Sequence, residues 1–340
     1  MKKIVLVLLS FVMAFAALAQ QKPALSKETL QANAAVATLK AFRKTSPLKL
    51  NAKRLELLKT MEVYSDGLPP AAFKEYLLAD EETAAALERT VPILYAYRAG
   101  FDKVLQEVQT SKVEQGSTHI WLLYNMGFVI KTPSGCFGID LDHRLAAHLA
   151  PHLDFLYITH NHADHYNMKL IAAMVEAGKP VISNFYTESA AYYATRDTIY
   201  QIDKFKIRTS ISDHLLSPDL PNFVAMARID CGEDSGNFSM LHCGDSGFDP
   251  TRFKAVQGPV DMLVLRWGAP RENNILGTGA GQVQTNYALL SHLIELRHNP
   301  YPKGQASILQ TLKHLPNVQC ENTLIPFWGE KLVWKNGKLN

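Results

Sequence analysis

Cysteine is scarce in this chain, and its pattern excludes one class of metal site. Only four cysteines occur among 340 residues, and none forms a CxxC pair of the kind found in zinc–thiolate sites. Four cysteines allow three disulfide pairings, and the sequence does not choose among them. Cys231 and Cys243 flank an expected hairpin and form the favoured pair. All four, Cys136, Cys231, Cys243 and Cys320, are equally compatible with buried thiols.

The chain also lacks an excess of charge of either sign. Lysine and arginine number 35 against 32 aspartates and glutamates, a formal charge of +3, and loss of Lys2 and Lys3 would leave +1. A surface that binds nucleic acid or anionic lipid needs a basic face. The composition therefore does not favour a nucleic-acid partner.

A long apolar segment occurs only at the N-terminus. Met1-Lys2-Lys3 is basic, residues 4–16 are almost unbroken apolar residues, and Ala17-Leu18-Ala19 has the form of a cleavage site. A membrane span needs about 20 apolar residues, so this run is too short, and no later segment approaches that length. We therefore expect a signal peptide over residues 1–19, no transmembrane segment, and an exported protein that is periplasmic or secreted.

The spacing of apolar residues changes near residue 113 and divides the mature chain in two. Residues 20–112 have helical spacing, with Asp80 as an expected N-cap and Pro69, Pro70 and Pro92 as helix breakers. Residues 113–340 contain short strands that alternate with helices. This order predicts an α/β fold, an αββα sandwich of two mixed sheets with helices outside, carrying an N-terminal helical extension.

A dense group of metal-binding side chains follows the apolar run 155–158. Within six positions the chain places three imidazoles and a carboxylate: His160, His162, Asp164 and His165. These groups are ligands of a borderline divalent cation such as zinc. Burying such a group without a partner costs about 1–3 kcal/mol by mutational data. The stretch predicts a metal site, the alternative being a solvated histidine-rich loop.

Three further strand ends supply side chains of the same kinds. His214 follows the expected strand 205–209, Asp245 follows the strand 238–243, and His292 follows the strand 287–290. In layered folds, sites form where loops leave the ends of strands. His242 competes with His214 for its role, and His298 competes with His292.

The spacing His-x-His-x-Asp-His, together with these downstream residues, resembles the signature of the metallo-β-lactamase superfamily of hydrolases. The resemblance covers roughly residues 118–330 and implies a dinuclear site. The seven implied ligands are three for a first divalent cation, three for a second and one that bridges them: His160, His162 and His214; Asp164, His165 and His292; and Asp245. The resemblance further implies two Zn²⁺ ions, or Mn²⁺ or Fe²⁺, sharing a hydroxide nucleophile, with Asp164 and Asp245 as the catalytic carboxylates.

Other side chains near the expected site are candidates for supporting roles. Asp140 ends the expected strand 136–139 and matches an acid that orients a metal ligand in this family, the alternative being an ordinary turn residue. The candidates for substrate binding lie just beyond strands: His143, Arg266, Trp267, Glu295 and His298.

The residues after the motif indicate a branch of the superfamily. The chain continues from Tyr166 directly into an expected helix over 168–176, as in the ascorbate-phosphate lactonase and N-acyl-phosphatidylethanolamine phospholipase D branches. Asp245 disfavours the secreted β-lactamases, which usually lack the bridging aspartate. The expected activity is hydrolysis of a lactone, ester or phosphodiester in a small-molecule or lipid-like substrate. The alternatives are a mononuclear iron oxygenase and a non-catalytic metal-binding protein on the same fold.

Overall fold

A computed structural model describes residues 27–340 apart from 216–219, 268–273, 299–306 and 319. The expected signal peptide over residues 1–19 lies outside the described residues. Among the helices of the described residues, none is both long enough and apolar enough to cross a membrane.

The N-terminal extension consists of helices in the described residues. Their bounds are α1 Lys27–Phe42, α2 Ala52–Asp66, α3 Pro70–Leu78, α4 Glu81–Thr90 and α5 Pro92–Thr110. Asp80 caps α4 as predicted, because its side chain accepts a hydrogen bond from the backbone N–H of Thr83. Pro92 is the first residue of α5, where its missing N–H leaves no intrahelical bond unmade. The proline breaks therefore lie where the sequence predicts them.

The first sheet has the strand order β14-β13-β1-β2-β3-β4-β5. Its strands are β1 Ser117–Tyr124, β2 Gly127–Lys131, β3 Cys136–Ile139, β4 Phe155–Tyr157, β5 Val181–Ile182, β13 Lys331–Lys335 and β14 Lys338–Leu339. β1 pairs antiparallel with β13 and with β2, whereas β3, β4 and β5 run parallel to one another. The carboxyl ends of β3 and β4 therefore meet at one edge of this sheet.

The second sheet has the order β12-β11-β10-β9-β8-β7-β6. Its strands are β6 Thr198–Ile202, β7 Phe205–Ser212, β8 Val224–Asp230, β9 Ser239–His242, β10 Gly258–Arg266, β11 Val283–Ser291 and β12 Asn322–Leu324. β8 is antiparallel to both β7 and β9, and β9, β10, β11 and β12 are parallel. Strands β7, β9, β10 and β11 consequently point the same way, and their carboxyl ends share one edge.

The two sheets pack face to face. The Tyr157 hydroxyl of β4 lies 3.0 Å from the Thr209 hydroxyl of β7 and donates to the Met226 carbonyl of β8 at 3.1 Å. The rings of Phe155 and Phe205 also meet across this interface, with centroids 5.6 Å apart. Because these contacts join strands of different sheets, the core of the two-sheet part lies between the sheets.

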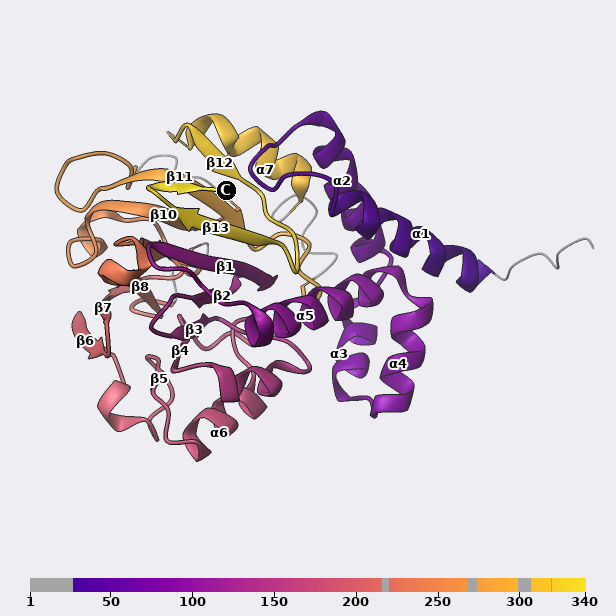
Figure 1. The fold of residues 1–340 in the computed structure, drawn as a ribbon, viewed down its shortest axis with the longest axis horizontal. Coiled ribbons are helices and arrows are strands. Elements are labelled where there is room, and N and C mark those ends of the chain that lie inside the picture. Colours follow the sequence, from indigo (N-terminus) through magenta and orange to yellow (C-terminus); the bar gives the residue numbers. More distant parts are fainter. Residues whose placement is uncertain (1–26, 216–219, 268–273, 299–306, 319) are drawn as a thin grey trace, which may run out of the picture.

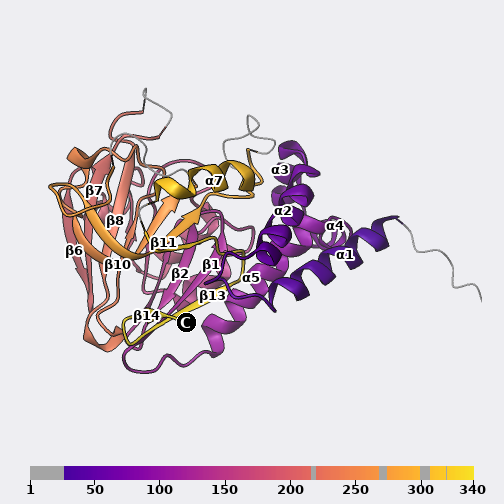
Figure 2. The same ribbon diagram turned by 90° about the horizontal axis from the view of Figure 1, so that it is seen from above.

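Helices lie outside the sheets. The extension, with α5 packed against β1, covers the first sheet, and α6 Met168–Glu176 packs against β4 and β5 (Figures 1 and 2). Helix α7 Ile308–His314 contacts α2 of the extension. Short 3-10 segments connect the elements at Ala146–His152, Ala190–Tyr192, Glu233–Ser235, Pro250–Arg252 and Leu315–Asn317. The predicted αββα sandwich with a helical extension is thus confirmed.

The prediction of a disulfide between Cys231 and Cys243 is wrong. All four cysteines are free thiols. β8 and β9 do form the predicted hairpin, but its register pairs Asp230 with Ser239 and Ala227 with His242. Cys231 and Cys243 therefore lie at opposite ends of the hairpin. Since a strand rises about 3.4 Å per residue, the separation far exceeds the reach of a disulfide.

Candidate metal centre

The candidate ligands lie at the ends of strands that face one another across the sandwich. The segment 159–165 follows β4 of the first sheet, whereas His214, Asp245 and His292 follow β7, β9 and β11 of the second. The shared direction of β7, β9 and β11 brings their carboxyl ends to one edge of the second sheet. The fold thereby collects side chains separated by more than a hundred positions.

The first group comprises His160, His162 and His214, whose nitrogens lie within 4.8 Å of one another. The Nε2 atom of His160 is 3.1 Å from Nδ1 of His162. His214 donates from Nδ1 to the Leu215 carbonyl at 2.7 Å, which leaves Nε2 as its ligand atom. His160 and His214 are buried and His162 is half-buried. This arrangement matches the predicted first cation site.

The second group comprises Asp164, His165 and His292. Oδ2 of Asp164 is 3.1 Å from Nε2 of His292 and 3.4 Å from Nε2 of His165. Asp245 lies between the two groups, because its carboxylate is 3.4 Å from Nε2 of His214 and 3.6 Å from Nε2 of His292. The structure thus brings the seven predicted ligands together.

Several of these ligand atoms are buried without a hydrogen-bond partner. They are Nε2 of His165, Nε2 of His214, Oδ1 of Asp164 and Oδ1 of Asp245. A buried polar atom without a partner costs about 1–3 kcal/mol, and a charged one costs more. A set of imidazole nitrogens and carboxylate oxygens directed at a common volume suits divalent cations such as Zn²⁺, Mn²⁺ or Fe²⁺. The donor atoms therefore fit the predicted metal ions.

The directions of the pKa shifts favour the deprotonated form, which can bind a cation, in most of the candidate ligands. Burial lowers the pKa of His160 well below its usual value, and burial lowers that of His162 to about 4. Burial alone would raise the pKa of Asp164, but His165 and His292 hold it well below its ordinary range. Asp164 and Asp140 raise the pKa of His165 despite its burial, so a cation must displace a proton from this ring.

Asp140 holds the ligand loop in place. Its carboxylate accepts hydrogen bonds from the Thr159 amide at 2.7 Å, from the Thr159 hydroxyl at 2.7 Å and from Nδ1 of His165 at 2.8 Å. The bond to Nδ1 fixes the His165 tautomer and directs Nε2 toward Asp164 and Asp245. Asp140 has a φ of 49°, a left-handed conformation that an aspartate tolerates better than most residues.

Asn125 is a supporting residue that sequence reasoning missed. Its side-chain amide donates to Oδ2 of Asp164 at 3.0 Å and to the Asp164 carbonyl at 3.2 Å. Asn125 occupies the turn between β1 and β2 with a φ of 51°. In the sequence an asparagine before Met126-Gly127 indicates a turn, and nothing local connects it to a motif 39 positions away.

Arg266 and Trp267 lie beside the bridging position. Arg266 ends β10, is only 4% exposed, and places Nε 3.5 Å from Oδ2 of Asp245. Within the described part of the chain, its Nε and Nη1 atoms make no hydrogen bond, and neither does Nε1 of the buried Trp267. A buried guanidinium with unsatisfied donors is suited to receive an anionic oxygen.

Glu295 and His298 lie next to Asp164 of the second group. Asp164, Glu295 and His298 offer ligand atoms within 4.8 Å of one another. The buried Glu295 carboxylate accepts from the Tyr124 hydroxyl at 2.8 Å and lies 2.9 Å from Nδ1 of His298. The His298 side chain is 46% exposed, the most exposed of this group. Because His298 is exposed and lies 4.0 Å from Asp164, a ligand bound at the cluster can reach it.

His143 is not placed to bind substrate, contrary to the prediction. It is fully buried, and its ring is stacked between Tyr97 and Phe101 of α5 at centroid distances of 4.0 and 4.3 Å. Its Nδ1 accepts a hydrogen bond from the Leu145 amide at 3.1 Å. A substrate cannot reach it, and His143 instead joins the extension to the loop after β3.

The two competing histidines are separated by the structure. Nε2 of His242 lies 2.9 Å from the Met126 carbonyl, and its Nδ1 accepts from the Gly244 amide, so His242 belongs to neither ligand group. His292 lies within the second group, whereas His298 contacts Asp164 only at 4.0 Å. The geometry therefore favours His214 and His292 for the predicted roles.

The fold and the centre together define an αββα sandwich with a His/Asp cluster at the strand ends. No family model matches the sequence, and no curated protein matches it either. Among solved structures, the chain is similar in fold to the metallo-beta-lactamase fold protein YhfI from Bacillus subtilis, with 15% identity, 65% of this chain and 99% of that chain covered, and a TM-score of 0.44.

Two further structures differ in the chemistry that their names state. Igni18, a metallo hydrolase from the archaeon Ignicoccus hospitalis, has 15% identity, covers 64% of this chain and 99% of its own, and gives a TM-score of 0.44. CmlA, a diiron beta-hydroxylase from Streptomyces venezuelae, has 12% identity, with 66% of this chain and 55% of that chain covered and a TM-score of 0.43.

Proposed function

We propose that this protein is a metal-dependent hydrolase that holds two divalent cations side by side. One observation carries this proposal. The predicted ligands fall into three groups of neighbouring side chains, and four of their ligand atoms are buried without a hydrogen-bond partner among the described residues. The first cation would be held by His160, His162 and His214, the second by Asp164, His165 and His292, and both by Asp245. When bound, such ions lower the pKa of water toward ~7 and polarise a carbonyl or phosphoryl oxygen.

The protein's own groups position the reactants. Asp140 fixes the tautomer of His165, and Asn125 holds the carboxylate of Asp164, so the ligand loop is preorganised. The unsatisfied Nε and Nη1 atoms of Arg266 favour a substrate with an anionic oxygen near the bond that breaks. Among the expected substrates this favours a phosphodiester, or a lactone or ester that carries an acidic group.

His298 is the exposed side chain beside the cluster. Because Glu295 holds the His298 ring through Nδ1, we expect this side chain to contact the substrate at the solvent side of the cluster. Trp267 and Arg266 would line the opposite, buried side. Zn²⁺ as the metal, export through residues 1–19, and the lactonase-like or phospholipase-D-like branch are parts of the same proposal.

Elemental analysis of the purified mature protein tests the proposal, together with hydrolysis of bis(p-nitrophenyl) phosphate and a simple lactone. We expect about two metal ions per chain and turnover that a chelator abolishes. One iron per chain would instead support the oxygenase alternative. Bound metal without hydrolysis of any substrate would support the non-catalytic alternative, and no bound metal after reloading would refute the assignment of the histidines.

Replacement of Asp164 by alanine separates metal binding from folding. We expect Asp164→Ala to lower the metal content and abolish hydrolysis while the circular dichroism spectrum is retained, because a ligand is lost from a loop that other contacts hold. Asp66→Ala, at an exposed position at the end of α2, is the matched control and should behave like the wild type. Unchanged turnover in Asp164→Ala would contradict the proposed mechanism.

Replacement of Arg266 tests the anionic substrate. We expect Arg266→Met to reduce kcat/KM for bis(p-nitrophenyl) phosphate by about 10²–10³-fold, because a donor directed at developing negative charge is removed. Hydrolysis of a neutral lactone should fall much less, and Arg266→Lys should restore part of the loss. An equal loss on both substrates would show that Arg266 serves only to balance the charge of Asp245.

A further inference from the structure

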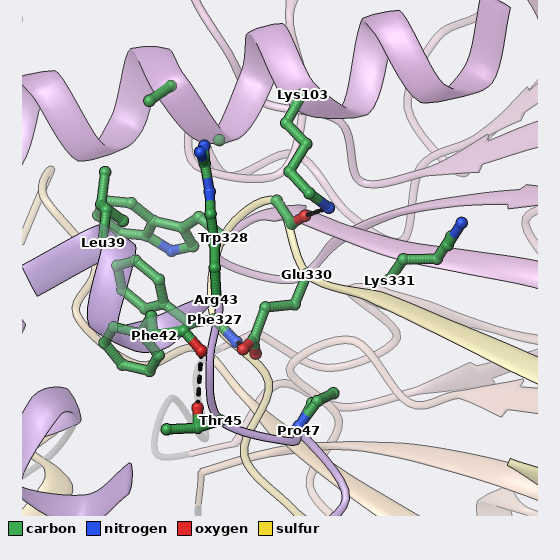
Figure 3. A pocket seen from close by; sticks show the side chains of 13 residues that line it. Leu39, Phe42, Arg43, Thr45, Pro47, Lys103, Phe327, Trp328, Glu330 and Lys331 are labelled. Carbon is green, nitrogen blue, oxygen red and sulfur yellow. Dashed lines mark hydrogen bonds between the residues drawn. The ribbon is translucent and has the colours of Figure 1, made fainter. Parts of the chain in front are cut away.

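A pocket lies between the helical extension and the two-sheet part, and none of its lining residues belongs to the metal centre. Its walls come from the end of α1 and the loop after it, from the middle of α5, and from residues 327–331 before and within β13 (Figure 3). Its volume is about 250 Å³. Drug-sized ligands occupy roughly 300–1,000 Å³, so this pocket suits a small ligand, and junctions between domains are common ligand sites.

One side of the pocket is aromatic. The rings of Phe42 and Phe327 are stacked with centroids 4.8 Å apart, and Phe327 is stacked in turn on Trp328 at 4.9 Å. All three side chains are at most 4% exposed, so their positions are fixed by packing. In Figure 3 these rings gather on one side, and the side chains of Lys103 and Lys331 lie on the other. An apolar body would pack against the rings with little rearrangement.

The other side of the pocket carries an excess of positive charge. Glu330 is neutralised by the buried Arg54, with Nη1 to Oε1 at 2.8 Å. Lys103 and Lys331 share a single carboxylate, that of Glu107, at 3.0 and 3.6 Å.

Arg43 adds a further cation at the mouth. This exposed side chain makes no ion pair with any of the described residues. The cationic side chains in and around the pocket outnumber the carboxylates by two. The cations are Arg43, Arg54, Lys103 and Lys331, and the carboxylates are Glu107 and Glu330. Figure 3 shows the Arg43 side chain running past Trp328 toward α5. An anionic group at this position would meet the Arg43 guanidinium, which none of the carboxylates among the described residues pairs with.

We propose that this pocket binds a small amphipathic anion, a carboxylate or phosphate attached to an apolar or aromatic body. The apolar body would lie against Phe327 and Trp328, and the acidic group would lie toward Arg43, Lys103 and Lys331. Phe327 and Trp328 also line a smaller cavity, together with Asn125 and Ser291. Asn125 holds Asp164, and Ser291 precedes His292. The proposal concerns binding and does not depend on the hydrolysis proposed above.

Titration calorimetry on the metal-loaded mature protein tests this site with 3-phenylpropionate as the probe. We expect saturable binding of one molecule per chain at this pocket, in addition to any molecule that binds at the metal centre. The neutral 3-phenylpropanamide should bind at least about tenfold more weakly, since it lacks the charge and a charge-assisted hydrogen bond contributes roughly that much. Acetate should also bind at least about tenfold more weakly, since it lacks the apolar body that would be buried against the rings. Equal affinity for 3-phenylpropionate and its amide would overturn the proposal.

Variants of the pocket distinguish it from the metal centre, to which a carboxylate would also bind. Arg43→Ala and Lys331→Ala should each weaken binding of 3-phenylpropionate by about tenfold, and Arg89→Ala, at an exposed position at the end of α4, should leave it unchanged. Because Arg43 is exposed, its variant should retain the wild-type unfolding temperature. Undiminished binding in both pocket variants would place the ligand elsewhere and refute the site, whatever the outcome of the metal analysis.

Discussion

At the scale of single residues, the candidate centre depends on the hydrogen bonds that fix each ligand as much as on the ligands. Three hydrogen bonds end on the carboxylate of Asp140, and one of them comes from His165. The Thr159 hydroxyl that donates to Asp140 also lies 3.0 Å from Nδ1 of His160. One acidic side chain thereby sets the orientation of ligands in both groups.

Asp140→Asn should weaken metal binding without removing a ligand. The amide cannot accept all three hydrogen bonds in the same geometry, so the His165 ring loses its fixed tautomer. We expect metal affinity or activity to fall about 10–100-fold, as measured by competition with a chromophoric chelator. Asp66→Asn is the control, and metal affinity equal to the wild type in Asp140→Asn would show that Thr159 alone orders the loop.

The clustering of the candidate ligands could be predicted because each follows a strand in a recognisable local pattern. His160, His162, Asp164 and His165 occupy a single segment, and that segment contains most of the signal. Asn125 could not be predicted, because its contact with Asp164 depends on the pairing of β1 with β2. His143 was misplaced for a related reason. Its position after a strand is compatible with a site, but packing by Tyr97 and Phe101 from a distant helix buries it.

At the scale of elements, α5 is the helix that joins the extension to the catalytic part. Its buried face contains Tyr97, Phe101 and Val104, which pack inward at helical spacing. Trp328 approaches this helix at Gly100, where a Cβ atom would come within 3.1 Å of the Trp328 Cβ. The His143 ring, enclosed by Tyr97 and Phe101, attaches the loop after β3 to the same face.

The enclosure of His143 makes part of the stability depend on pH. Burial is the main cause that lowers its pKa well below the ordinary value, so the folded protein keeps it neutral. In the unfolded chain His143 gains a proton below about pH 6.5. The stabilisation is therefore fully present above about pH 6.5 and is lost as the pH falls toward the lowered folded pKa.

His143→Phe should remove this dependence, because phenylalanine retains the stacking and cannot be protonated. Between pH 7 and pH 5 we expect the free energy of unfolding of the wild type to fall by up to about 2 kcal/mol more than that of the variant. Urea unfolding in the presence of a chelator, followed by circular dichroism, measures the difference. His148→Gln, at an exposed position, should follow the wild type. Parallel pH profiles for wild type and His143→Phe would assign the dependence to other buried histidines.

Most elements could be predicted from local periodicity, and those missed have a common cause. The bounds of α6 equal those expected, since the Asn167 side chain caps its first turn. Strand β13, Lys331–Lys335, was missed because its existence depends on pairing with β1, more than two hundred positions earlier. The length of β7 was underestimated for the same reason, since pairing with β8 extends it to Ser212.

At the scale of the whole molecule, a buried ion pair connects the two ends of the described chain. The Arg54 side chain of α2 is fully buried, lies over the Phe42 ring at 5.4 Å and pairs with Glu330 before β13. It also donates to the Ile325 carbonyl at 2.6 Å. The extension is thus attached to the C-terminal segment by charge as well as by packing.

Arg54→Met should destabilise the protein by about 3–5 kcal/mol, because Glu330 would be left largely buried without its partner. Chemical unfolding with guanidinium chloride measures the loss. The double variant Arg54→Met/Glu330→Gln should recover part of it, since the unpaired charge is removed. Lys53→Met, which breaks only an exposed ion pair with Glu56, is the control. A loss in Arg54→Met no greater than in this control would show that the pair contributes little.

The division of the ligands between the two sheets has a consequence for the order of events during folding. Residues 160–165 follow a strand of the first sheet, and His214, Asp245 and His292 follow strands of the second. Neither sheet alone presents a complete set of donors, so a cation cannot bind firmly until the two layers have docked. Metal acquisition should accordingly be the last step of maturation. Under the proposed metal binding, a higher concentration of free metal would then make separation of the layers rarer.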